Sequence, residues 1–260
     1  MPPSHDTALP AIILHVISFI QYFAALQTVE LTMVKDTQAG LFDSFTQREK
    51  ETLQLTLTDQ NDGTKNRQIG NHGTLTLYHD VFNDAEAELM LTGLIECLNW
   101  QQPSIRMHGK EVLIPRKQVW MGDSNTSYRY SGRLFVPETW NDRVLECKRR
   151  IETLSGYHYN SVLCNLYRDG QDSVSWHADD EPELDPTTPI ASLSLGATRR
   201  FDLKPKSGEQ QRMQLPLENA SLLVMSPEVQ VFWLHQIAKT KKVHAPRINL
   251  TFRRVIPTNG

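Results

Sequence analysis

The stretch Arg247-Ile-Asn249-Leu-Thr251-Phe-Arg253 alternates strictly between polar and apolar side chains. Because successive side chains of a strand point to opposite faces, its apolar residues share one face and its polar residues share the other. A row of polar groups on the inner face of a core strand costs free energy unless something polar or anionic meets it. A dicarboxylate is such a partner, since the planar guanidinium of arginine binds a carboxylate at two points. The alternative is an edge strand whose polar face lies in water.

Short runs of β-forming residues precede this stretch, separated by turn sequences such as Asp169-Gly170, Asp185-Pro186 and Ser207-Gly208. With the stretch itself, the expected strands are Val162–Tyr167, Ile190–Leu195, Arg200–Leu203, Arg212–Leu217, Ser221–Met225, Val231–His235 and Arg247–Phe252. Many short strands with turns between them favour an antiparallel sandwich or barrel.

Two amphipathic helices are expected before these strands. One covers 84–98, with Asn83 or Asp84 as its N-cap, and the other covers 139–154. The polar segment 43–70 reads as a tethering arm that contains a helix at most. The sequence therefore predicts one α+β domain that is mainly β, over 71–256, preceded by an N-terminal extension over 1–70 that is poorly ordered or partly non-native.

One segment of that extension, residues 11–26, is nearly all apolar. It is short for a membrane span and has no basic residue before it, as a secretory signal would. Our preferred interpretation is that residues 1–32 are a non-native or mis-started extension. An interfacial anchor and a poorly formed targeting signal are the alternatives, and we expect no stable membrane association.

The overall charge and the cysteines limit the class of protein. The formal net charge is −3, so nucleic-acid binding would depend on local clusters such as Lys239-Thr-Lys241-Lys242 and Arg199-Arg200. Such clusters can equally be solvated faces. Cys97, Cys147 and Cys164 form no Cys-x-x-Cys pair, which argues against a disulfide framework or a thiolate zinc site and for a reducing compartment.

Two short patterns can hold a metal ion. In His177-Ala-Asp179 the imidazole and the carboxylate project to the same side of an extended segment. His235 ends the apolar run Val231–Leu234 and supplies a second imidazole. Two histidines and one carboxylate form the facial set that suits non-haem Fe(II). Each pattern alone has a plainer explanation, which for His235 is a hydrogen-bonded histidine at a strand end.

Asn165-Leu-Tyr167 places two more polar groups on one face of the strand that leads to the metal pattern. Both could donate hydrogen bonds to a small acid. An ordinary half-exposed strand would show the same pattern of polar residues.

Taken together, these patterns resemble the AlkB family of Fe(II)- and 2-oxoglutarate-dependent nucleic-acid dealkylases over about residues 100–256. The resemblance is closest to the animal-type DNA-repair branch, through Pro115-Arg-Lys117, Tyr128-Arg-Tyr130-Ser-Gly132 and His177-Ala-Asp-Asp180-Glu181. It implies a double-stranded β-helix, or jelly-roll, barrel with N-terminal helices and a nucleotide-recognition lid at about 100–135.

The resemblance also implies a role for each site residue. Iron would be held by His177, Asp179 and His235. The cosubstrate 2-oxoglutarate would be surrounded by Asn165, Tyr167, Arg247, Asn249, Thr251 and Arg253. Arg247 would pair with its distal carboxylate, and Arg253 would lie nearer the metal.

The substrate implied is alkylated DNA, preferably single-stranded, with RNA as a further possibility. Bases alkylated at N1 of adenine or N3 of cytosine are cationic, and they favour an aromatic face and a nearby carboxylate. The predicted substrate-binding residues are Tyr128, Tyr130, Asp180, Glu181, Met107, His108 and Arg116. His108 stands at the position where duplex-active relatives carry an aromatic hydrocarbon side chain. This difference puts efficient activity on double-stranded DNA in doubt. Alternatively, Asp180 and Glu181 belong to a solvent-exposed loop, and Tyr128 and Tyr130 only pack against neighbouring side chains.

The expected reaction consumes O2 and 2-oxoglutarate and releases succinate, CO2 and formaldehyde together with the unmodified base. We expect a monomer, cytoplasmic in a bacterium and nuclear or cytoplasmic in a eukaryote. Three alternatives remain: a same-barrel dioxygenase acting on protein, lipid or RNA, a non-catalytic nucleic-acid-binding relative, and a cupin-like metal isomerase. The last does not explain the polar face of residues 247–253.

Overall fold

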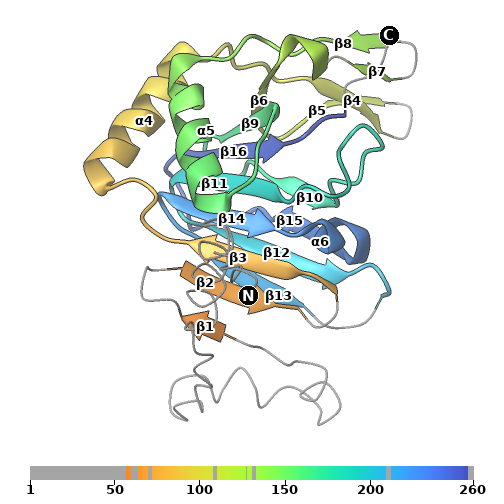
Figure 1. The fold of residues 1–260 in the computed structure, drawn as a ribbon. Coiled ribbons are helices and arrows are strands. Elements are labelled where there is room, and N and C mark those ends of the chain that lie inside the picture. The colour runs from red at the N-terminus through yellow and green to blue at the C-terminus, as the bar shows by residue number, and fades with distance from the viewer. Residues whose placement is uncertain are drawn as a thin grey trace, which may run out of the picture.

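Two antiparallel sheets make up most of the protein in the computed structural model, which describes residues 57–59, 64–69, 72–107, 110–126, 128–130, 133–208 and 212–256 (Figure 1). The larger sheet has the strand order β1-β2-β3-β14-β11-β16-β9-β6. These strands are β1 (Leu57–Asp59), β2 (Thr64–Gln68), β3 (Thr74–Tyr78), β14 (Ser221–Met225), β11 (Ile190–Gly196), β16 (Arg247–Arg253), β9 (Ser161–Tyr167) and β6 (Lys117–Gly122).

The smaller sheet has the order β10-β15-β12-β13. Its strands are β10 (Val174–His177), β15 (Trp233–Ile237), β12 (Arg199–Pro205) and β13 (Met213–Leu217). Two hairpins lie outside these sheets, β4 (Ser104–Met107) with β5 (Lys110–Leu113) and β7 (Tyr128–Tyr130) with β8 (Arg133–Phe135). The short 3-10 helix η2 (Ser124–Thr126) lies between β6 and β7. The mainly β class predicted from sequence is confirmed.

Strand β16 is a central strand of the large sheet, paired with β11 on one side and with β9 on the other. Its apolar residues Ile248, Leu250 and Phe252 are fully buried in the core beneath the helices. Its polar residues Arg247, Asn249 and Thr251 are also buried, at 2%, 7% and 6% exposure. The edge-strand alternative is therefore wrong, because the polar face of β16 looks into the protein and not into water.

Helices α4 (Asp84–Cys97) and α5 (Asp142–Ser155) cover the outer face of the large sheet (Figure 1). The α4 helix begins after Asn83, whose side chain accepts a hydrogen bond from the Glu86 backbone, while the Glu86 side chain accepts one from the Asn83 backbone. This capping box satisfies two amides at the helix start and confirms the cap predicted there. The α5 helix begins a few residues later than expected, after Asn141, which caps it.

Two expectations from sequence were wrong. Residues 43–70 were expected to contain a helix at most, yet β1 and β2 add to the edge of the large sheet by pairing with β3. Val231–His235 was expected to be a strand, but α6 (Pro227–Phe232) occupies its first part. Proline at the first helical position is preorganised for a helix, and this local preference outweighs the β propensity of Val231 and Phe232. The boundary at residue 70 stays a prediction.

The apolar segment 11–26 lies outside the described residues. Among those that the structure describes, no helix combines the length and the hydrophobicity that crossing a bilayer requires.

Candidate metal and cosubstrate site

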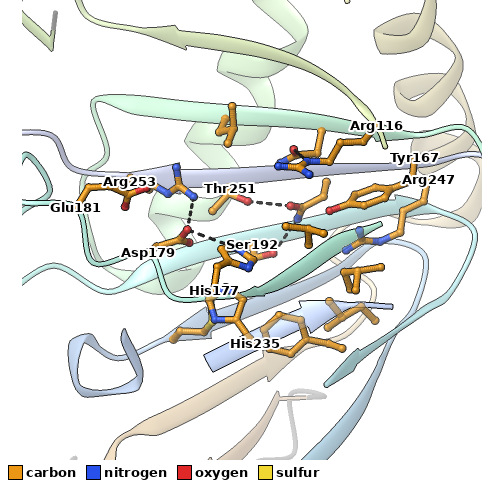
Figure 2. Close-up of a pocket in the computed structure, with 18 residues that line it drawn as sticks. Arg116, Tyr167, His177, Asp179, Glu181, Ser192, His235, Arg247, Thr251 and Arg253 are labelled. Atoms are coloured by element: carbon orange, nitrogen blue, oxygen red, sulfur yellow. Dashed lines mark hydrogen bonds and ion pairs between the residues drawn. The ribbon is translucent and has the colours of Figure 1, made fainter. Parts of the chain in front are cut away.

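A cavity lies between the two sheets, and the polar face of β16 forms part of its wall (Figure 2). Its volume of about 160 Å³ is room for on the order of ten waters, or for one small organic acid. Apolar side chains from both sheets complete the lining: Leu163, Val174, Phe201, Leu217, Met225 and Ile237. The cavity thus combines an apolar lining from both sheets with the polar side chains of β16.

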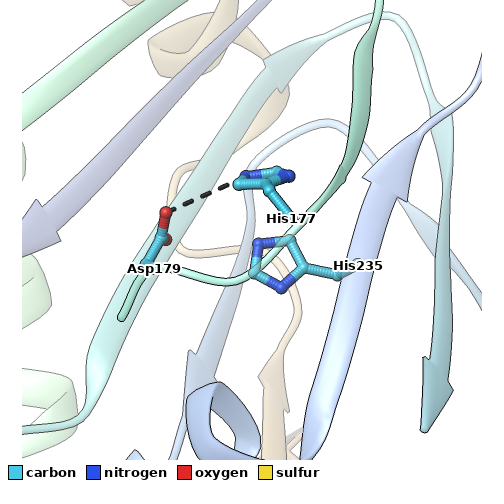
Figure 3. A group of neighbouring side chains, drawn as sticks. All are labelled: His177, Asp179 and His235. Atoms are coloured by element: carbon cyan, nitrogen blue, oxygen red, sulfur yellow. Dashed lines mark ion pairs between the residues drawn. The ribbon is translucent and has the colours of Figure 1, made fainter. Parts of the chain in front are cut away.

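His177, Asp179 and His235 converge at one end of this cavity (Figure 3). Each offers a ligand atom, and these three atoms all lie within 4.8 Å of one another. His177 and His235 face each other across the β10–β15 pair, and their rings lie 4.3 Å apart between centroids. The two segments that sequence analysis singled out therefore meet, although 56 positions separate Asp179 from His235.

The backbone fixes which ring nitrogen of His177 is free. Nδ1 lies 2.8 Å from the Ser175 carbonyl oxygen, which can only accept a hydrogen bond, so Nδ1 carries the proton. The lone pair is then on Nε2, which lies 3.8 Å from Oδ1 of Asp179. A carbonyl that holds one imidazole nitrogen in this way is the usual support for a metal-binding histidine.

The charges of the other two residues also suit a cation. Burial raises the pKa of Asp179, but the positive charges of Arg253, His235 and His177 and the hydrogen bond from Arg253 together outweigh it and lower the pKa to about 2. Burial lowers the pKa of His235 to about 4 against the opposing charge of Asp179. At neutral pH the site therefore offers a carboxylate and a neutral imidazole. Nδ1 of His235 is buried without a hydrogen-bond partner in the described structure.

The opposite end of the cavity is built around Arg247, whose guanidinium lies 5.2 Å from the centre of the Tyr167 ring (Figure 2). Nη2 donates to Oγ of Ser194 over 2.9 Å, whereas Nε and Nη1 are buried without a hydrogen-bond partner among the described residues. Burial lowers the pKa of Arg247 to about 10, so it stays charged at neutral pH. Each unpaired buried donor costs about 1–3 kcal/mol, which a bound carboxylate would recover.

Between the two ends, the polar wall is internally hydrogen-bonded. Asn249 donates to Ser192 over 2.8 Å, and Thr251 donates to Oδ1 of Asn249 over 2.8 Å. Ser192 and Ser194 were missed from sequence, although Ser192-Leu-Ser194 shows the same alternation as β16 and pairs with it directly. Gln230 was also missed. It is an isolated polar residue in an apolar run, and it gives no such signal.

Of the predicted substrate-binding residues, Glu181 and Arg116 line the cavity, and Asp180 does not. Glu181 lines the cavity, whereas the exposed Asp180 carboxylate pairs with Lys206 over 2.7 Å. Arg116 also lines the cavity, but its Nε donates to Oδ1 of Asn165 over 2.9 Å, on the side predicted to hold the cosubstrate.

The remaining substrate-side predictions fall on the predicted lid. Tyr128 and Tyr130 lie on β7, and Met107 ends β4. His108 lies outside the described residues. The roles predicted for these four residues stay predictions.

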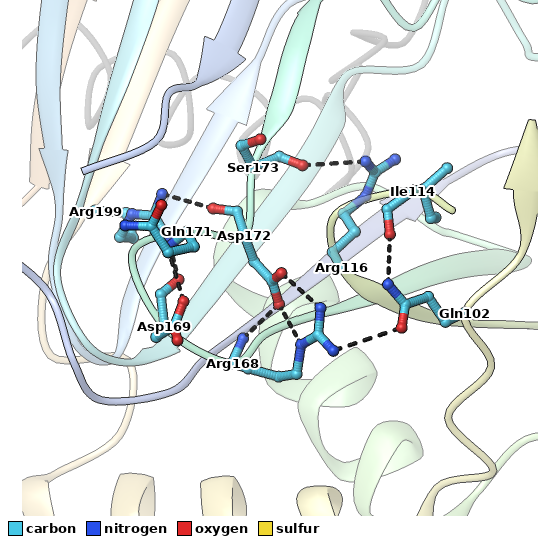
Figure 4. A network of polar contacts seen from close by, with 9 residues as sticks. All are labelled: Gln102, Ile114, Arg116, Arg168, Asp169, Gln171, Asp172, Ser173 and Arg199. Carbon is cyan, nitrogen blue, oxygen red and sulfur yellow. Dashed lines mark hydrogen bonds and ion pairs between the residues drawn. The ribbon is translucent and has the colours of Figure 1, made fainter. Parts of the chain in front are cut away.

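The loop that leads from β9 to the metal pattern is held by a separate network (Figure 4). Asp172 accepts hydrogen bonds from Nε and Nη2 of Arg168, each over 2.8 Å. Arg199, only 2% exposed, donates to the backbone oxygens of Asp169, Asp172 and Ala238. The network ties the segment before His177 to the residue that follows β15, so it connects the two parts of the chain that carry the metal-binding candidates.

The fold and the site define a class. Residues 74–253 match the model of the 2OG-Fe(II) oxygenase superfamily, and the donor set fits its cofactors: two imidazoles and a carboxylate for Fe(II), and a buried arginine for 2-oxoglutarate. The chain is thus an Fe(II)- and 2-oxoglutarate-dependent dioxygenase. It belongs to the AlkB family, in the branch that contains animal ALKBH2 and alkB homolog 3.

Two relatives illustrate this membership. The chain is 35% identical to mouse DNA oxidative demethylase ALKBH2 over 202 residues, which are 74% of this chain and 84% of that protein. It is 37% identical to human alpha-ketoglutarate-dependent dioxygenase alkB homolog 3 over 190 residues, covering 70% of this chain and 66% of that protein. The solved structure of OsALKBH1 superimposes with a TM-score of 0.52 at 16% identity, covering 76% of this chain and 99% of that one, which supports the jelly-roll fold alone.

Proposed function

We propose that this enzyme removes alkyl groups oxidatively from N-alkylated nucleic-acid bases. One observation carries the proposal: a metal-binding set and a buried arginine with unpaired donors face one cavity, within a chain 35% identical to a DNA oxidative demethylase. Fe(II) with 2-oxoglutarate and O2 supplies the oxidising power to hydroxylate an alkyl carbon, yielding succinate and CO2. The hydroxylated alkyl group then leaves as an aldehyde, formaldehyde in the case of a methyl group, and the normal base remains.

The protein's own contribution is to bind and to orient. His177, Asp179 and His235 would hold the iron, and Arg253 would keep the Asp179 carboxylate ionised through the contact between Nη2 and Oδ1. Arg247 would take the distal carboxylate of 2-oxoglutarate at the other end of the cavity. The remaining polar residues of this wall would contact the cosubstrate between these ends: Asn165, Tyr167, Asn249 and Thr251.

On the substrate side, Glu181 is the best-placed carboxylate for a cationic base because it lines the cavity beside the metal set (Figure 2). Tyr128 and Tyr130 would supply the aromatic face that such a cation favours. Single-stranded nucleic acid is the proposed preferred form, because the base must leave its stack to reach the iron, and this costs least where no partner strand holds it. We propose that the enzyme acts as a monomer.

The test is direct repair. The protein is incubated with Fe(II), 2-oxoglutarate and ascorbate, together with single-stranded or duplex DNA oligonucleotides that carry 1-methyladenine or 3-methylcytosine. An RNA oligonucleotide with the same lesions is included, and mass spectrometry follows the loss of the methyl group. Repair is expected to be fastest on single-stranded DNA. Succinate formation without repair of any of these bases would indicate a same-barrel dioxygenase with a protein or lipid substrate.

A further inference from the structure

Gln230 on α6 contacts the backbone of Asp179. The Gln230 side chain is only 6% exposed, and its Oε1 accepts a hydrogen bond from the Asp179 amide over 3.1 Å. The orientation is unambiguous, because a backbone N–H can only donate and the side-chain oxygen must face it. The other half of the Gln230 amide donates to Sδ of Met225 over 3.7 Å. The contact is therefore a buried and directed hydrogen bond to the central residue of the metal set.

The same helix leads to the third member of the set. The α6 helix ends at Phe232, the amide of its C-cap Trp233 donates to the Val229 carbonyl, and β15 begins at Trp233 and carries His235. Gln230 is thus five positions before one metal-binding candidate and hydrogen-bonded to another that lies 51 positions earlier in the chain. No other side-chain hydrogen bond in the described structure reaches the Asp179 backbone from α6.

The α6 helix is itself fixed to the large sheet, so it can serve as a rigid reference. Ser226, its N-cap, accepts a hydrogen bond from the Thr74 amide at Oγ over 2.9 Å and donates its own amide to the Thr74 carbonyl over 3.0 Å. Gly73 packs so closely that a Cβ there would lie 2.8 Å from Cγ2 of Val229, and its φ of +126° also requires glycine. The start of β3 thereby holds α6, and α6 holds Asp179.

We propose that Gln230 is a positioning residue for the metal centre, which sets the backbone of Asp179 relative to His235 before the metal binds. The inference rests on the proposed role of His177, Asp179 and His235 as iron ligands. Arg253 holds the Asp179 carboxylate and Gln230 holds its backbone, so together they leave the side chain little freedom. Loss of such an outer contact lowers metal affinity by about 10- to 100-fold in other metal sites.

The test compares Gln230→Met with Gln230→Glu. Methionine keeps the length and the apolar packing but offers only a weak acceptor, whereas a buried glutamate keeps a carbonyl-type oxygen in the same place. Gln230→Leu is a second acceptor-free variant, in case the methionine variant does not fold. Val231→Ala is the matched control, because Val231 is the next residue of α6 and is 60% exposed.

Two measurements are made on the full chain. Hydrogen exchange of the Asp179 amide, followed by NMR in the metal-free protein, reports the contact itself. Titration with Mn(II), followed by the EPR signal of the free ion, reports metal affinity. In Gln230→Met we expect exchange to accelerate at least about tenfold and the Mn(II) Kd to rise about 10- to 100-fold. We expect both values in Gln230→Glu and Val231→Ala to stay within about threefold of the unmodified protein.

Three other outcomes would each overturn a defined claim. Unchanged Mn(II) affinity in the acceptor-free variants, with wild-type protein that binds Mn(II), would reject the positioning role alone. An equal loss of affinity in Gln230→Glu would show that the acceptor oxygen is not what matters. Wild-type protein that binds neither Mn(II) nor Fe(II) would reject the proposed function, and the exchange measurement would still decide whether the contact forms.

Discussion

The Arg253 guanidinium donates a hydrogen bond from Nη2 to Oδ1 of Asp179 over 2.7 Å, and so connects the end of β16 to a residue 74 positions earlier in the chain. Both groups are well buried, with side-chain exposures of 15% and 5%. Because Arg247 begins the same strand, β16 reaches from the arginine end of the cavity to the metal end. A single central strand thus connects the proposed cosubstrate end of the site, at Arg247, with the proposed metal end, at Asp179.

Asp179→Ala should abolish both metal binding and 2-oxoglutarate turnover. Alanine removes the only carboxylate of the proposed metal-binding set and leaves the guanidinium of Arg253 without this partner. Breaking a buried ion pair in this way lowers the free energy of unfolding by about 3–5 kcal/mol. Iron stoichiometry and succinate formation are the measurements, with circular dichroism to verify that the variant folds. Succinate formation at the wild-type rate would show that Asp179 is not a ligand.

Arg247→Met should raise the KM for 2-oxoglutarate while the metal affinity changes little. The loss of a buried ion pair to a carboxylate costs about 2–3 kcal/mol, which corresponds to a rise of about 30- to 150-fold. Steady-state kinetics of succinate release give the KM. Arg149→Met is the control, because Arg149 is an exposed arginine on α5 and does not line the cavity. An equal change of the KM for 2-oxoglutarate in both variants would show that Arg247 does not bind the cosubstrate.

Alternation on a strand was enough to predict the polar wall, because a period of two fixes which side chains share a face. The burial of Arg247 and Asn249 followed from the same pattern once β16 had neighbours on both sides. The sequence could not show that β16 is central, since pairing partners such as Ser161–Tyr167 are distant in the chain. The structure therefore decided between a core strand and an edge strand.

Other features left no local signal. Gln230 is a single polar residue between valines, and only the fold of α6 brings it to Asp179. The helix itself was hidden because Val231 and Phe232 favour strands, whereas the proline that starts it lies before the expected strand. The strands β1 and β2 were missed because their mainly polar sequences lack the apolar alternation that predicts a half-buried strand.

Glu181→Gln should impair repair of cationic bases more than Asp180→Asn does. Glu181 lines the cavity, while the Asp180 carboxylate already has Lys206 as its partner. An exposed charge contributes up to about 1 kcal/mol, so kcat/KM for 1-methyladenine should fall about fivefold in Glu181→Gln. Succinate formation without nucleic acid should stay unchanged in both variants.

The comparison substrate for this pair of variants is a neutral methylated base such as 3-methylthymine. If Glu181 acts through its charge, repair of this base should fall less than repair of 1-methyladenine. An equal loss for both bases would mean that Glu181 shapes the cavity mouth and does not recognise charge.

Asp172→Asn should make the fold less sensitive to acid. Burial raises the pKa of Asp172, but its hydrogen bonds with Arg168 and the charges of Arg168 and Arg199 together outweigh this and leave the pKa below its ordinary value of 3.8. A carboxyl whose pKa is lowered by folding stabilises the protein at pH values above the ordinary pKa, and this contribution is lost as the pH falls through the lower pKa of the folded state. The free energy of unfolding of the wild type should therefore fall more steeply than that of Asp172→Asn as the pH drops below about 4.

At pH 7 the free energy of unfolding of Asp172→Asn should be lower than that of the wild type by about 1 kcal/mol, a small difference because Arg168 is half-exposed. Urea unfolding at a series of pH values measures both effects, and Glu88→Gln, an exposed change on α4, serves as the control. Parallel pH curves for wild type and Asp172→Asn would show that this ion pair does not contribute to acid sensitivity.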